Sequence, residues 1–122
     1  MFIRLYWKVF AWSLLMLILF IAPSRSLPEG PGFPMFDKIV HILLFGVFTS
    51  LLILARFRQK QDFHIRFPLV LHTFFTALLF GILIELIQLW MNMGREGSIA
   101  DVLADMAGYF AGLGLIWIYK IN

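Results

Sequence analysis

The chain has 122 residues, of which 61% are hydrophobic and only 14% are charged. A soluble domain carries about 25% charged residues because most of its surface faces water, so this composition excludes an ordinary soluble domain. The apolar residues are grouped in long blocks, and a helix of roughly 20 such residues crosses the hydrocarbon of a bilayer. The sequence therefore predicts a small integral membrane protein.

Three further classes are excluded by residues that are missing or scattered. The chain has no cysteine, which excludes a disulfide scaffold, and it has no glycine-rich phosphate loop of a nucleotide-binding enzyme. The net charge of +3 would suit nucleic acid, but the Lys and Arg residues are dispersed between the apolar blocks. These cations are better explained as signals of membrane topology, and we expect no nucleic-acid partner.

The first apolar block covers residues 5–22 and ends before Pro23. Arg4 and Lys8 near its start resemble the beginning of a signal peptide. The block is long for such a peptide, however, and the Pro-Ser-Arg-Ser sequence that follows is a poor cleavage site. We therefore expect a retained membrane-spanning helix.

Three more blocks follow, over residues 36–57, 68–91 and 98–119. A segment rich in proline and glycine, residues 27–34, separates the first two spans because it cannot continue a helix. Pro68 is favourable in the first turn of the third span. The prediction is an all-α fold, a four-helix membrane bundle in a single domain over residues 1–122.

The direction of the spans follows from the positive-inside rule, which counts Lys and Arg in the short flanking loops. Seven of the ten cations fall on one side of the predicted membrane: Arg4, Lys8, Arg56, Arg58, Lys60, Arg66 and Lys120. We therefore expect both termini to face the cytoplasm and the first and third loops to face outward.

Polar residues recur at the outward ends of three spans. Ionised groups inside hydrocarbon cost about 2.5 to 3.5 kcal/mol each, so those present usually face the bundle interior. With a rise of about 1.5 Å per residue, His41, Glu85 and Asp105 come to similar depths. The full set of candidate site residues is Asp37, Lys38, His41, Glu85, Gln88, Arg95, Ser98, Asp101 and Asp105.

Each candidate also has a structural explanation. Ser98 and Asp101 have the spacing of a capping box at a helix start, and Lys38 can extend its amine to water. A hydrogen-bond network between helices contributes only about 0.6 kcal/mol on average in membranes, far less than the insertion cost of the charges. We therefore favour a functional role for His41 and Glu85, which are the catalytic candidates, whereas for Lys38 we favour the extension of its amine to water. For Asp101 capping and function stay open. His64 and His72 are expected to be incidental.

The fourth span carries small residues every four positions, at Ala104, Gly108 and Gly112, with Ala107 and Ala111 beside them. Small side chains at this spacing let two helices approach closely where lipid supplies no hydrophobic drive. The stripe adjoins Asp105, so close packing and the polar site are expected to coincide.

Taken together, three motifs make the chain resemble the VanZ-like family of bacterial membrane proteins. They are D-K-x-x-H at 37–41, E-x-x-Q at 85–88, and R-x-x-S-x-x-D at 95–101 with Asp105 beyond it. The resemblance implies a multi-pass protein of the bacterial cytoplasmic membrane, linked to the cell envelope and to low-level resistance to the glycopeptide teicoplanin. The family more often has Asn where this chain has Asp105.

Three functions remain open, in this order of preference. The first is binding or modification of an anionic envelope lipid, such as a lipid-linked cell-wall precursor, at the outward site. A divalent cation held by Asp37, His41, Glu85, Asp101 or Asp105 would reconcile the acids with such a ligand, although D-x-x-x-H is a weak metal signal. The second is a non-catalytic scaffold that binds other envelope proteins. The third is an ion or proton transporter, which would need polar groups across the whole membrane.

Overall fold

The computed structural model describes residues 2–21, 36–91 and 99–121, and these form four helices and the short connection between the middle two. The helices are α1 (Phe2–Ile21), α2 (Phe36–Lys60), α3 (Phe67–Met91) and α4 (Ile99–Ile121). Each is long and apolar enough to cross a membrane. The predicted all-α fold of four membrane-spanning helices is therefore confirmed.

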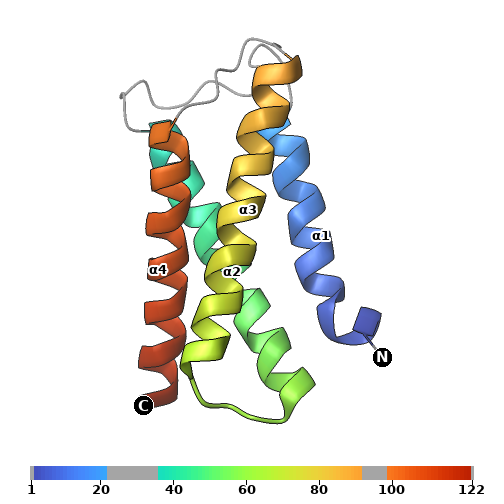
Figure 1. Cartoon of the computed structure of the whole chain (residues 1–122), viewed down its shortest axis with the longest axis vertical. Helices are drawn as coiled ribbons and strands as arrows, with labels where there is room; N and C mark the ends of the chain where they lie inside the picture. The colour runs from blue at the N-terminus through green and yellow to red at the C-terminus, as the bar shows by residue number, and fades with distance from the viewer. Residues whose placement is uncertain (1, 22–35, 92–98, 122) are drawn as a thin grey trace.

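The helices run along the long axis of the molecule, so that their ends gather at two opposite poles (Figure 1). At the upper pole lie the ends of α1 and α3 and the beginnings of α2 and α4 (Figure 1). At the lower pole lie both termini and the connection from α2 to α3 (Figure 1). This arrangement places the polar beginnings of α2 and α4 next to the polar end of α3.

The second helix continues three residues past its predicted end, through Arg58 to Lys60. Long cationic side chains favour helix, and cations suit the negative end of the helix dipole. The helix ends at Gln61, whose φ of 54° places it in the left-handed region that commonly terminates helices. The membrane-spanning pattern predicted the buried part of α2, and capping at the surface decided where it stops.

The close contact in the bundle is between α2 and α4, and it depends on two glycines of the small-residue stripe. A Cβ atom on Gly108 would lie 2.5 Å from the carbonyl oxygen of Ile42, and one on Gly112 would lie 2.5 Å from that of Gly46. Neither position has room for a side chain. Ala107 and Ala111 beside them are exposed. The stripe is therefore used for packing inside this chain, as predicted.

Aromatic side chains fill the space between the helices on the upper half of the bundle. Phe45 is fully buried and its ring lies within 6.5 Å of the Phe20 ring and 6.0 Å of the Phe80 ring, measured between centroids. Large apolar side chains also cover the outer surface of every helix, where lipid would contact them. The core therefore needs few polar groups, and those that are buried require a separate explanation.

Candidate functional site

Three buried polar side chains, one from each of α2, α3 and α4, meet near the upper pole. His41 and Asp105 are fully buried and Glu85 is 6% exposed. One ligand atom from each side chain lies within 4.8 Å of the others. The structure thus brings together the three residues for which the sequence predicted similar depths. We call His41, Glu85 and Asp105 the buried triad.

The His41 imidazole is fixed from two directions. Its Nδ1 lies 2.6 Å from Asp105 Oδ1, a distance at which the ring N–H donates to the carboxylate. The Phe20 ring stacks on the imidazole with centroids 4.3 Å apart and an interplanar angle of 18°. The acid sets the tautomer and the aromatic ring sets the plane, so the remaining nitrogen, Nε2, has a defined direction.

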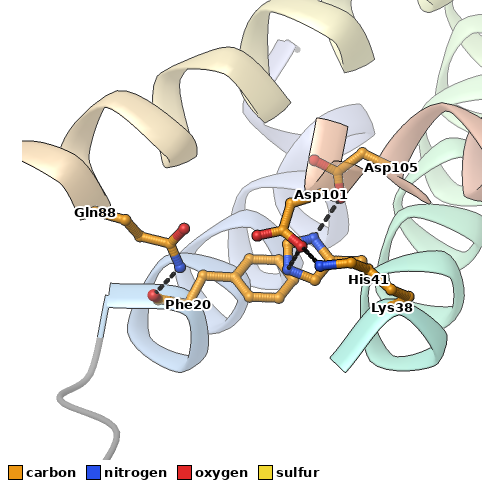
Figure 2. Close-up of polar contacts among 6 residues, drawn as sticks. All are labelled: Phe20, Lys38, His41, Gln88, Asp101 and Asp105. Atoms are coloured by element: carbon orange, nitrogen blue, oxygen red, sulfur yellow. Dashed lines mark hydrogen bonds and ion pairs between the residues drawn. The ribbon is translucent and has the colours of Figure 1, made fainter. Parts of the chain in front are cut away.

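A second acid and a cation lie beside that nitrogen, as Figure 2 shows. Asp101 is in the first turn of α4, is 3% exposed, and its Oδ1 lies 3.9 Å from His41 Nε2. The same carboxylate forms an ion pair with the Lys38 ammonium. Capping alone therefore does not account for Asp101. Lys38 pairs with an acid, whereas the sequence had favoured extension of its amine to water.

Asp105 also contacts α3, at a glycine. A Cβ atom on Gly81 would lie 2.8 Å from Asp105 Oδ2, so the missing side chain makes room for the carboxylate. Gly81 is one helical turn before Glu85 and therefore on the same face of α3. Sequence reasoning did not single out Gly81, although its spacing from Glu85 was the available signal.

Gln88 contributes to the site through α1. Its side-chain amide donates to the backbone carbonyl of Phe20, in the last turn of that helix, where carbonyl groups lack helical partners. This bond holds the end of α1, and with it the ring that stacks on His41 (Figure 2). The sequence predicted that Gln88 supports His41 and Glu85, and the described contact acts on His41 through Phe20. Phe20 itself was not predicted, because nothing in an apolar block distinguishes one phenylalanine from the next.

Three predicted site residues lie outside what the structure describes. Arg95 and Ser98 belong to residues 92–98, which are not described. Asp37 is in the first turn of α2, and its side chain is likewise not described. Their assignment to the site stays a prediction from spacing.

The buried triad offers two kinds of chemistry. An imidazole oriented by a carboxylate is a general acid or base when a substrate proton comes within reach of its other ring nitrogen. An imidazole nitrogen and two carboxylate oxygens are also ligands of Zn²⁺, bound at about 2.0 to 2.2 Å, so two ligands of one ion are at most about 4.4 Å apart. The tetrahedral geometry usual for Zn²⁺ puts its ligand atoms about 3.4 Å apart, so atoms at the 4.8 Å limit would have to move more than about 1 Å closer. His41, Glu85 and Asp105 are thus the residues that would hold a divalent cation.

Comparisons with known proteins identify the chain at the level of the family. No curated protein and no solved structure matches it. A protein-family model does match the chain. It covers nearly the whole sequence, including every residue of the triad, and agrees with the resemblance carried by the three motifs. Residues 1–120 match the family described as VanZ/LLP1, and the chain therefore belongs to that family.

Proposed function

We propose that this protein binds the anionic headgroup of an envelope lipid, such as a lipid-linked cell-wall precursor, at the upper pole. One observation carries the proposal: three separate helices each place a buried ionisable side chain in one cluster. Two acids and an imidazole are costly to insert into a membrane, and a purely structural network could use uncharged groups. A ligand or a reaction at the cluster accounts for the cost.

The surroundings of the triad favour an anionic ligand at the membrane surface. Lys38, whose side chain is 26% exposed, lies at the rim of the site and is paired to the buried Asp101. The beginnings of α2 and α4 are at the same pole, and helix N-termini attract phosphate. Arg95 and Ser98 would extend this rim by their sequence positions, whereas Asp37 would add an acid to it. A phosphate group at the rim would bring the rest of a lipid headgroup towards His41.

In this proposal the residues divide the work. His41 exchanges a proton with the ligand through Nε2, while Asp105 holds its tautomer and Phe20 its plane. Glu85 acts as a second base or as the group that orients the ligand. Lys38 releases Asp101 as it engages the anion. The same geometry would serve either catalysis by His41 and Glu85 or binding without a reaction. An assay for chemical turnover of the bound lipid distinguishes these two possibilities.

The proposal includes an orientation and a cellular role. Both termini face the cytoplasm, so the upper pole opens to the outside of the bacterial cytoplasmic membrane. Support comes from the lower pole, where Figure 1 places both termini and the connection that carries the excess of cations. A site at that position meets envelope precursors, and reduced sensitivity to teicoplanin-type antibiotics is the expected phenotype.

The test is native mass spectrometry of the purified full chain, with Glu85→Gln and His41→Gln as variants. We expect wild-type protein to retain an added lipid-linked cell-wall precursor, and both variants to lose that lipid while keeping helical circular dichroism. His72→Gln is the matched control, because His72 is exposed on α3 and lies outside the triad. Unchanged lipid retention and unchanged teicoplanin sensitivity in folded Glu85→Gln would contradict the proposal.

A further inference from the structure

A cavity at the opposite pole has no part in the triad. Its volume is about 300 Å³, at the lower limit of typical small-molecule sites. It is formed where the end of α2, the connection 61–66 and the beginning of α3 meet. The membrane-spanning stretches of these helices end at Lys60 and resume at Phe67, which places the cavity at the membrane surface.

The walls of the cavity combine charge and apolar surface. Arg56, Lys60 and Arg66 supply cationic groups, and Phe57 and Leu69 supply apolar ones. The Lys120 ammonium lies 4.9 Å from the centre of the Phe57 ring and adds a further positive charge close by. Such a lining suits a ligand that is anionic at one end and apolar at the other.

The acid in the cavity is already engaged. Asp62 Oδ1 lies 2.7 Å from His64 Nδ1, and Asp62 Oδ2 accepts from Arg66 Nε at 3.0 Å. These two hydrogen bonds lower the pKa of the Asp62 carboxyl to about 2, so it stays ionised and holds Arg66. His64, which was expected to be incidental, is thus bonded to Asp62, two residues before it in the connection.

The other two cations have no acid to neutralise them. Arg56 contacts the ring of His72, and within the described part of the chain neither Arg56 nor Lys60 forms an ion pair with Asp or Glu. Arg56 is half-buried, and burial of a cation away from water is unfavourable unless an anion accompanies it. Topology alone requires cations on this side of the membrane, but it does not require them to line one cavity with apolar walls.

The geometry points to a binding site for the phosphate group of an anionic phospholipid, with Arg56 and Lys60 on the phosphate and Phe57 and Leu69 against the adjoining apolar part. This site is independent of the function proposed for the upper pole. It lies at the other end of the bundle and shares no residue with the triad. Lipid held there would fix the turn between α2 and α3.

The experiment compares two double variants of the purified full chain that remove equal charge. Arg56→Gln with Lys60→Gln alters the cavity. Arg4→Gln with Arg58→Gln removes two exposed cations from the same pole, outside the cavity. Phosphatidylglycerol retention is measured by native mass spectrometry, with phosphatidylcholine and inorganic phosphate as separate probes. We expect affinity for phosphatidylglycerol to fall about tenfold in the cavity variant and less than twofold in the control.

Each outcome is decisive. Equal loss in the two double variants would show general attraction to a positive surface and would overturn the site. Equal retention of phosphatidylcholine and phosphatidylglycerol by wild-type protein would do the same. Binding of inorganic phosphate that is lost only in the cavity variant would support the phosphate site and assign it to a soluble ligand. If the double variant fails to fold, Lys60→Gln alone gives the same test at an exposed position. Glu85→Gln should leave this binding unchanged, which separates it from the upper site.

Discussion

His41 has an acid on one ring nitrogen and an aromatic ring on its face, and these two neighbours determine what the side chain can do. With Nδ1 bonded to Asp105, Nε2 lies on the side of Asp101, 3.9 Å from its Oδ1. The same logic applies to Lys38, whose charge is held by Asp101 until a ligand competes for it. At the scale of single residues, the neighbouring side chains therefore fix the orientations of His41 and Lys38 as well as their charge environment.

Asp105 gives the first prediction at this scale. Asp105→Asn should keep the fold, because the amide oxygen still accepts from His41 Nδ1. Asp105→Ala should lower the free energy of unfolding by about 1 to 3 kcal/mol, since a buried imidazole then loses its acceptor. Thermal unfolding of both variants in the same detergent measures the difference. Equal stability of the two would show that the His41 bond does not matter to folding.

Asp62 gives the second prediction at this scale. Its folded pKa is about 2, below its ordinary value of 3.8, because His64 and Arg66 donate to the ionised carboxylate. A depressed pKa stabilises the folded turn at pH values above 3.8, and that contribution is lost as the pH falls through about 2. NMR titration of the Asp62 carboxyl carbon should give a midpoint near 2, and His64→Ala should raise it. A midpoint at the ordinary value would contradict the two hydrogen bonds.

At the scale of elements, the bundle is organised by the contact of α2 with α4. Gly108 and Gly112 bring the two backbones together, and this closeness puts His41 opposite Asp105 and Lys38 opposite Asp101. The two glycines of the small-residue stripe thus pack against α2 inside this chain. A transporter would need a path of polar groups across the whole membrane. The buried polar groups nearer the lower pole are hydroxyls such as Thr73 and Tyr109, which bond to each other at 2.8 Å and so give little support to that hypothesis.

Gly108 supplies the prediction for this contact. Gly108→Ala would place a Cβ 2.5 Å from a backbone oxygen that cannot rotate away, so α2 and α4 must separate. Overpacking of this kind typically costs about 1 to 3 kcal/mol. Gly114→Ala is the control, because nothing lies within 4 Å of the added atom and alanine favours helix. We expect lower thermal stability and weaker lipid retention only in Gly108→Ala, and similar behaviour of both variants would argue against close packing.

At the scale of the whole molecule, the two poles have different characters. The upper pole holds a buried triad with mixed charge, and the lower pole holds a cationic cavity at the surface. In the proposed orientation, one pole meets envelope precursors and the other meets the anionic inner leaflet. Apolar and aromatic packing holds the bundle together between them, so the two proposed sites share no residue.

The orientation itself is directly testable because the chain has no cysteine. His64→Cys in the α2–α3 connection and Glu96→Cys in residues 92–98 give two single labels. A membrane-impermeant maleimide added to intact spheroplasts should label the residue at 96 and not the residue at 64. The reverse pattern would contradict the proposed direction and would place the triad towards the cytoplasm.

The number of helices and the depth of the polar residues follow from the sequence alone. Apolar runs long enough to cross a bilayer must satisfy their backbone groups internally, so four runs of this length dictate four helices. Periodicity along each helix then placed His41, Glu85 and Asp105 at similar depth, and the small residues at 108 and 112 marked a close contact. Those conclusions required only the helical rise and the cost of polar groups in lipid.

The rotation of the helices about their axes, and the choice of neighbours, came only from tertiary structure. Depth does not tell whether two side chains face each other, and that depends on where the α2 and α4 backbones can touch. The roles of Phe20 and Gly81 also arise there, because a stacking ring and an absent side chain have meaning only beside His41 and Asp105. The cavity between α2 and α3 is likewise a product of the fold, since its cations look in sequence like ordinary topology signals.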